Sequence, residues 1–102
     1  MITIHEVQND RGQLCNRILR ALPDWFGIES AIVNYVSDVE SMLTLGAQHN
    51  STEDVAFLAL NFHNEFNAEV HVMAVLPEYH GLGLGTALIL SLIHISEPTR
   101  PL

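Results

Sequence analysis

Glycines at every second position, Gly81, Gly83 and Gly85, separate a strand-like segment from an apolar segment with helical spacing. The preceding segment, residues 68–75, is rich in β-branched residues, and Pro77 ends it because proline cannot donate to a sheet ladder. Glycines let the backbone come close to a ligand, and the free amides and dipole of a helix start favour phosphate. The sequence therefore predicts a strand, an anion-binding loop and a helix, around which the rest of the chain is organised.

Two common phosphate-binding motifs do not match this glycine spacing. A P-loop requires Gly-Lys followed by Ser or Thr, and the chain contains no lysine. The dinucleotide-binding fingerprint requires G-x-G-x-x-G, whereas the spacing here is G-x-G-x-G. Both nucleotide-binding folds are therefore disfavoured.

The segment of residues 74–85 resembles motif A of the GNAT superfamily, the acyl-CoA-dependent N-acyltransferases. In that motif, Gln or Arg precedes two variable residues, a glycine, a variable residue and a glycine or alanine, after a strand that often ends near a proline. Here residues 80–85 read His-Gly-Leu-Gly-Leu-Gly after Pro77, and His80 stands where Gln or Arg is commonest. The order of the predicted elements also suits the family, so the resemblance covers residues 1–89.

Hydrophobic spacing predicts the remaining elements. Strands are expected at residues 2–7, 42–47 and 54–61, and the nearly unbroken apolar run of the last of these predicts burial on both faces. Helices are expected between Asp10 and Pro23 and at residues 29–39. This pattern indicates an α/β protein of the α+β type. The resemblance implies a GNAT fold truncated after the third helix, with a mixed, mainly antiparallel sheet of about four strands.

Residues 90–102 depart from the family and resemble the translation, in one frame, of a transposase-type sequencing adapter. We therefore expect an incomplete GNAT domain at residues 1–89 and a non-native tail at 90–102; the alternative is a natural short C-terminal helix. The apolar spacing predicts that the last helix continues past Ile89 and stops before Pro98. The resemblance implies that the second half of the site, with the usual general acid, is absent, so we expect this chain to be inactive.

The resemblance also implies that acetyl-CoA is the acyl donor. Its pyrophosphate would meet the amides of residues 81–86, with the His80 ring as a further donor. Its pantetheine arm would pair with the backbone of residues 73–75, where an amide polarises the acyl carbonyl. The residues expected to bind acetyl-CoA are Met73, Ala74, Val75, His80, Gly81, Leu82, Gly83, Leu84, Gly85 and Thr86.

Acetyl transfer requires an unprotonated acceptor, and a lysine-like amine has a pKa of about 10.4, so a base must take a proton. In some GNAT members a glutamate on the strand before the loop does this, and Glu69 lies in the matching Ala-Glu-Val segment. His71 lies on the same strand face and is the second catalytic candidate. Trp25 and Phe26 either plug the edge of the core or, as the resemblance implies, contact the acceptor substrate.

Composition limits the partners and the location. The 102 residues allow one small domain, and the net charge of -8 disfavours nucleic acid. That charge either only maintains solubility or favours a cationic substrate such as an amine. The six histidines and Cys15 show no metal-ligand spacing, and a single cysteine excludes an internal disulfide, as in a reducing compartment. Because no signal peptide or membrane-spanning run is recognised, we expect a cytoplasmic protein with no membrane partner.

The leading hypothesis is an acyl-CoA-dependent N-acyltransferase that moves acetyl from acetyl-CoA to a primary amine by direct attack, assisted by a general base. The alternative is a non-catalytic GNAT-like module that binds or senses acyl-CoA. The acceptor stays open among peptide N-termini, lysine, polyamines and antibiotic amines. An open edge on the strand at residues 68–75 would also allow two copies to pair as a homodimer.

Overall fold

The computed structural model describes residues 1–64 and 67–95. Along the chain it contains β1 (Ile2–Val7), α1 (Arg11–Arg20), α2 (Glu29–Val39), β2 (Leu43–His49), β3 (Asp54–Asn64), β4 (Asn67–Val75), the 3-10 turn η1 (Pro77–Tyr79) and α3 (Leu84–Ile95). The predicted α+β class and the order of the elements are confirmed. β2 begins one residue later than expected and extends to His49, and β3 continues to Asn64.

The strands form one sheet in the order β1-β2-β3-β4. Every pairing between these described strands is antiparallel, so the expected mainly antiparallel sheet is confirmed and no parallel pair makes it mixed. β4 lies at one edge of this sheet and leads through η1 into the glycine-rich loop. The edge position leaves one side of the β4 backbone without a neighbouring strand.

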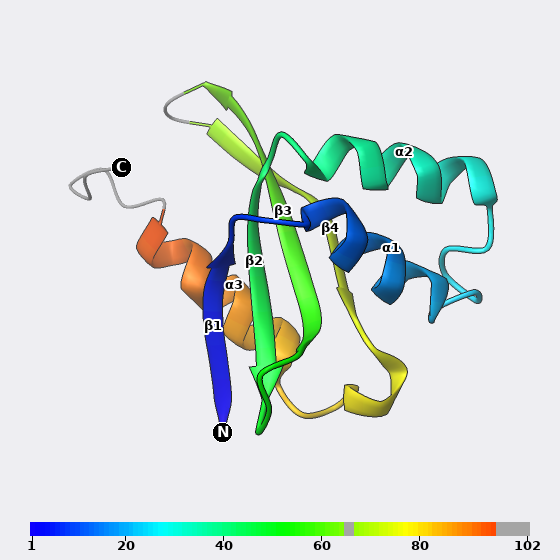
Figure 1. Ribbon diagram of the computed structural model, residues 1–102. Coiled ribbons are helices and arrows are strands. Elements are labelled where there is room, and N and C mark those ends of the chain that lie inside the picture. Colours follow the sequence, from blue (N-terminus) through cyan, green and yellow to red (C-terminus); the bar gives the residue numbers. More distant parts are fainter. Residues whose placement is uncertain (65–66, 96–102) are drawn as a thin grey trace.

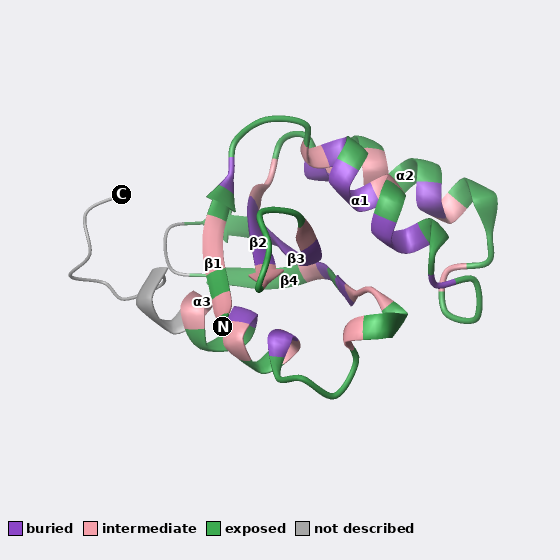
Figure 2. Cartoon of the chain, turned by 60° about the horizontal axis from the view of Figure 1, so that its bottom comes forward, coloured by how far each residue is buried: buried purple, intermediate pink, exposed green. Residues whose placement is uncertain are grey.

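Helices cover both faces of the sheet: α1 and α2 lie on one face, and α3 crosses the other (Figure 1). β3 runs through the middle of the core, since every residue from 55 to 60 is buried, as the apolar run predicted. Phe57 packs with the α1–α2 side and Leu58 with the α3 side, and burial of each side chain contributes about 1.5–3 kcal/mol. Figure 2 shows that the first half of β4 is exposed by contrast.

Helix α3 continues through Ile95, past Ile89, as the apolar spacing predicted. Leu84 and Leu88 lie on its buried side and pack against the sheet. Pro98 and most of the proposed tail lie outside the described residues, as do residues 65 and 66 of the turn between β3 and β4. None of the described helices has the length and hydropathy needed to cross a membrane.

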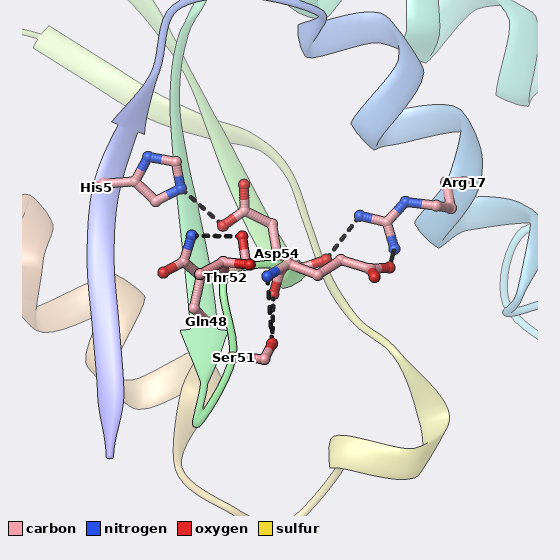
Figure 3. A network of polar contacts seen from close by, with 7 residues as sticks. His5, Arg17, Gln48, Ser51, Thr52 and Asp54 are labelled. Carbon is pink, nitrogen blue, oxygen red and sulfur yellow. Dashed lines mark hydrogen bonds and ion pairs between the residues drawn. The ribbon is translucent and has the colours of Figure 1, made fainter.

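A polar network joins α1 to the sheet at the start of β3 (Figure 3). The Asp54 carboxylate reaches His5 Nε2 of β1 at 2.7 Å, crossing β2 above Gly46, where an added Cβ would lie 2.8 Å from that carboxylate. Arg17 donates to the Asp54 carbonyl at 2.7 Å and pairs with Glu53 at 3.1 Å. These contacts hold α1 on its face of the sheet and so help to place the segment that follows α1.

Candidate active site

The chain leaves the sheet at the end of β4 and enters the candidate site. Leu76 N–H donates to the Val55 carbonyl at 2.9 Å, and Pro77 then opens η1. α3 begins at Leu84, directly after the glycine-rich loop. The strand, loop and helix predicted from the sequence are therefore confirmed.

Two of the three loop glycines have backbone angles that favour glycine. Gly81 has φ of +81° and Gly83 has φ of +87°, in the left-handed region. A Cβ added at either position would meet nothing within 4 Å, so the space in front of both glycines is open. Gly85 differs, because its added Cβ would lie 3.8 Å from Met73 Cε, an ordinary contact. Conformation thus demands glycine at 81 and 83, whereas alanine fits at 85.

The first turn of α3 presents backbone donors to this open space. Ala87 N–H donates to the Gly83 carbonyl at 3.0 Å, which makes Gly83 the residue at which the helical bonding begins. The amides of Leu84, Gly85 and Thr86 therefore have no acceptor within the helix. These amides and the positive end of the helix dipole favour an anion.

The outer edge of β4 exposes the backbone groups of Met73 and Val75. The bond between Leu76 and Val55 puts residue 76, and by alternation residue 74, in bonding positions towards β3. The N–H and C=O groups of Met73 and Val75 consequently point away from the sheet. The position of His80 is consistent with an outward carbonyl at Val75, since His80 Nε2 lies 2.7 Å from the Val75 carbonyl oxygen.

A cleft of about 460 Å³ joins the glycine loop, the outer edge of β4 and the segment between α1 and α2. Its lining residues are Leu22, Trp25, Phe26, Met73, Ala74, Val75, Tyr79, His80, Gly81, Gly83, Leu84, Gly85 and Thr86. Of the residues expected to bind acetyl-CoA, Leu82 alone is outside this lining, with 47% of its surface exposed. Leu22 and Tyr79 were not predicted; the apolar helical spacing of Leu22 signalled only a core residue.

Trp25 and Phe26, from the segment between α1 and α2, also line the cleft. The Trp25 ring is 68% exposed and meets the His80 ring edge-on, with 6.0 Å between ring centroids. Phe26 is more covered and packs edge-on against Tyr35 of α2, also with centroids 6.0 Å apart. Phe26 thus packs at the core edge, and both residues line the cleft, while their contact with an acceptor substrate stays a prediction.

The two candidate bases lie outside the cleft lining. Glu69, on the outer half of β4, is 59% exposed and pairs with His63 at 3.0 Å. His71 is 25% exposed, and its Nε2 lies 3.0 Å from Asp38 Oδ2 of α2. The structure therefore brings the predicted cofactor and acceptor residues together but leaves both bases beside the cleft.

A register shift in the β3–β4 pairing sets the position of His71. Ala59 pairs with Val72 and Leu60 pairs with Val70, so His71 is an extra residue on β4. Such a bulge re-aims the side chain and allows it to meet α2. The Tyr35 ring also contacts His71 edge-on, with centroids 5.4 Å apart.

Neither a cysteine nucleophile nor a metal site is found among the described residues. Cys15 is fully buried, and burial, with a smaller contribution from the Asp38 charge, raises the pKa of its thiol to about 12. The thiol therefore stays protonated and inaccessible at neutral pH. Among the described residues, no group of three His, Cys, Asp or Glu side chains is placed to hold a metal ion.

Comparison with known families gives a match over most of the chain. The model described as "Acetyltransferase (GNAT) family" matches residues 13–99. No curated protein sequence matches the chain.

Several solved structures share this fold. The ribosomal-protein-S18-alanine N-acetyltransferase from Escherichia coli has a TM-score of 0.75 at 23% identity, over 94% of this chain and 59% of that protein. The IAA acetyltransferase from Bacillus cereus has a TM-score of 0.65 at 20% identity, over 94% and 58%. An aminoglycoside 6'-N-acetyltransferase complexed with coenzyme A has a TM-score of 0.71 at 19% identity, over 92% and 54%. The chain thus spans somewhat more than half of each structure.

Proposed function

The chain belongs to the GNAT acetyltransferase family, and from this membership we propose that it binds acetyl-CoA in the cleft and transfers the acetyl group to a primary amine. One observation carries the proposal. Three features meet in the same cleft. They are the open space in front of Gly81 and Gly83, the free amides at the start of α3, and the outward backbone groups of β4. A related fold is known in complex with coenzyme A, which supports this choice of donor.

The residues present fit the phosphate portion of coenzyme A. The amides of Leu84, Gly85 and Thr86 supply donors, and the positive φ values of Gly81 and Gly83 keep side chains out of their way. None of the residues that line the cleft is Lys or Arg, so the phosphates would rest on backbone dipoles.

The outer edge of β4 fits the pantetheine arm. The N–H and C=O groups of Met73 and the N–H group of Val75 are directed outward and are available to an extended chain that carries amides. An outward amide at this edge would also stabilise the charge that develops on the acyl oxygen. His80 occupies the Val75 carbonyl, so we propose that His80 positions the loop and does not contact the phosphates directly.

In the reaction, the amine nitrogen attacks the thioester carbonyl, the C–S bond breaks, and the thiolate leaves. The amine proton must pass to a base. We propose His71 ahead of Glu69 for this role, because Asp38 orients its ring and the side chain is less exposed. Since neither residue lines the cleft, the proton would travel through water.

The placement of the candidate bases outside the cleft also favours a second candidate function, a module that binds acyl-CoA without turnover. The binding groups are assembled around one cleft, whereas both candidate bases stand outside it. A module that senses acyl-CoA requires only the binding groups. Amine-dependent thiol release by the purified chain would favour the transferase, whereas binding alone is common to both functions.

The test combines calorimetric titration of acetyl-CoA with an assay of thiol release in the presence of primary amines. We expect saturable binding by the 102-residue chain. Binding with amine-dependent thiol release supports the transferase. Binding without release agrees with the inactivity expected from the sequence, and an incomplete transferase would show it as well as the module. Failure to bind acetyl-CoA would contradict both functions.

Where turnover occurs, Glu69→Gln and His71→Gln separate the candidate bases. Loss of the true base should lower the rate more at neutral pH than at alkaline pH, because more of the amine is already deprotonated there. Rates from about pH 7 to 10 provide the comparison. A loss that is equal at every pH would mean that the residue positions the substrate instead.

A further inference from the structure

Trp25, the only tryptophan of the chain, forms an unusually exposed part of the cleft wall. Its surface is 68% exposed although the ring contacts the His80 ring edge-on. A large aromatic ring that remains accessible beside a cleft offers a flat apolar surface to a ligand. The Trp25 ring is therefore not needed to fill the core and is available to contact a ligand.

The segment that carries Trp25 is held in place by its own hydrogen bonds. The amides of Trp25 and Phe26 both donate to the Leu22 carbonyl, at 3.1 and 2.9 Å. At the base of this segment, Arg20 forms a bidentate ion pair with Glu29, with N–O distances of 2.8 and 2.7 Å. The aromatic wall is therefore preorganised before any substrate arrives.

The cleft wall is neutral even though the whole chain has a net charge of -8. Apart from His80, none of the described residues that line it has an acidic or basic side chain. Asp38 pairs with His71 outside the cleft, and Glu69 pairs with His63. The acidic character of the protein thus lies elsewhere on its surface.

Two further carboxylates belong to residues that precede lining residues in the chain. Asp24 precedes Trp25 and Glu78 precedes Tyr79, and both are exposed and outside the cleft lining. Water and salt screen charges in such positions. They can attract a single ammonium group from a distance, but they cannot replace the buried counter-ions that several ammonium groups would need.

Building on the proposed transferase function, we propose that the acceptor is a primary monoamine carried on an aromatic-bearing stem, an arylalkylamine. Trp25 and Phe26 contact the ring, and the aromatic faces attract the single ammonium group. A polyamine or an aminoglycoside would have to leave several charges against a wall whose described residues carry no carboxylate. The preference for a monoamine follows from the lining of the cleft, and the net charge of the chain alone would predict the opposite.

The test is calorimetric titration of 2-phenylethylamine and of spermine into the purified chain, free and saturated with coenzyme A. Titrations run at about 25 mM and about 250 mM salt, since salt screens charge-driven binding and leaves contact-driven binding. The proteins are the unchanged chain, Trp25→Ala, Trp25→Phe and the control Phe62→Ala. Phe62 is 44% exposed on β3 and does not line the cleft, so it matches Trp25 as an exposed ring.

We expect 2-phenylethylamine to bind about tenfold more tightly than spermine at the higher salt. Trp25→Ala should weaken its binding by about tenfold, while Trp25→Phe and Phe62→Ala stay within about twofold. Tighter spermine binding at both salt concentrations would overturn the proposal, as would equal losses in Trp25→Ala and Phe62→Ala. Failure of coenzyme A to bind would count against the transferase function, whereas titrations into the free chain would still decide the amine preference.

Discussion

The two walls of the cleft are built in different ways. The wall formed by the glycine loop, the start of α3 and the edge of β4 offers mainly backbone N–H and C=O groups. The opposite wall, formed by Leu22, Trp25 and Phe26, offers side chains. Any residue with a tolerated backbone angle supplies the same amide, whereas each side chain presents a different surface.

This difference separates two kinds of recognition. The backbone wall suits a ligand whose recognition does not require particular side chains, because its donors depend on conformation and little on residue type. The side-chain wall suits a ligand that differs between members. We therefore expect changes on the backbone wall to affect coenzyme A, and changes on the aromatic wall to affect the amine.

The largest effect is expected from Gly83→Val. Valine is strained at a φ of +87°, so the loop must change its path and move the donors at the start of α3. We expect the affinity for coenzyme A to fall by about ten- to a hundredfold and the free energy of unfolding by about 1–2 kcal/mol. Calorimetry and urea denaturation measure the two quantities.

Gly85→Ala is the matched control for that change, because Gly85 has an ordinary φ and an added Cβ meets only Met73 Cε at 3.8 Å. Its affinity for coenzyme A should stay within about twofold. If both variants bind like the unchanged chain, backbone conformation does not define this wall.

A smaller effect is expected from His80→Ala. The variant frees the Val75 carbonyl and removes the ring that meets Trp25. Since His80 is exposed, we expect a loss of about 0.5–1.5 kcal/mol in the free energy of unfolding, near the lower limit. The affinity for coenzyme A should fall only about threefold, because the loop amides are retained.

His80→Gln sharpens the test, because an amide side chain can donate to the same carbonyl. If His80→Gln restores both the free energy of unfolding and the affinity for coenzyme A, the positioning role of His80 is supported. Should His80→Ala lose as much affinity as Gly83→Val, His80 would instead contact the ligand.

The smallest effect is expected from Glu29→Gln, at the base of the aromatic wall. The hydrogen bond from Arg20 lowers the pKa of Glu29 below its ordinary value of 4.5. Stabilisation by the carboxylate is therefore present above that value and is lost as the pH falls through the lowered pKa. The variant should be slightly less stable at neutral pH and equal to the unchanged chain in acid.

Urea denaturation midpoints between about pH 7 and pH 2 follow this difference. Both side chains are largely exposed, so the change should be close to the limit of detection. A difference that grows in acid would show that the ion pair is not its cause.

Much of the backbone wall could be predicted from the sequence. Residues 81–85 alternate glycine with leucine directly after a strand that Pro77 ends, and the backbone consequences of glycine and proline are local. The helical spacing that carries α3 through Ile95 is local as well. The loop, its free amides and the following helix therefore follow from short-range rules.

The positions of the candidate bases could not be predicted in the same way. Strand alternation placed Glu69 and His71 on one face, but the register shift at His71 depends on how β3 pairs with β4. The contact between His71 and Asp38 joins residues that lie far apart in the chain. No local pattern in the sequence signals either feature.

The sequence by itself thus determined the strand, the glycine loop, the helix and the family, because backbone angles and hydrophobic spacing act over a few residues. Only the tertiary structure decided that the Trp25 ring meets the His80 ring, that His80 bonds to the Val75 carbonyl and that both candidate bases lie outside the cleft lining. These contacts depend on the packing of helices and strands from distant parts of the chain, and local spacing carries no information about them.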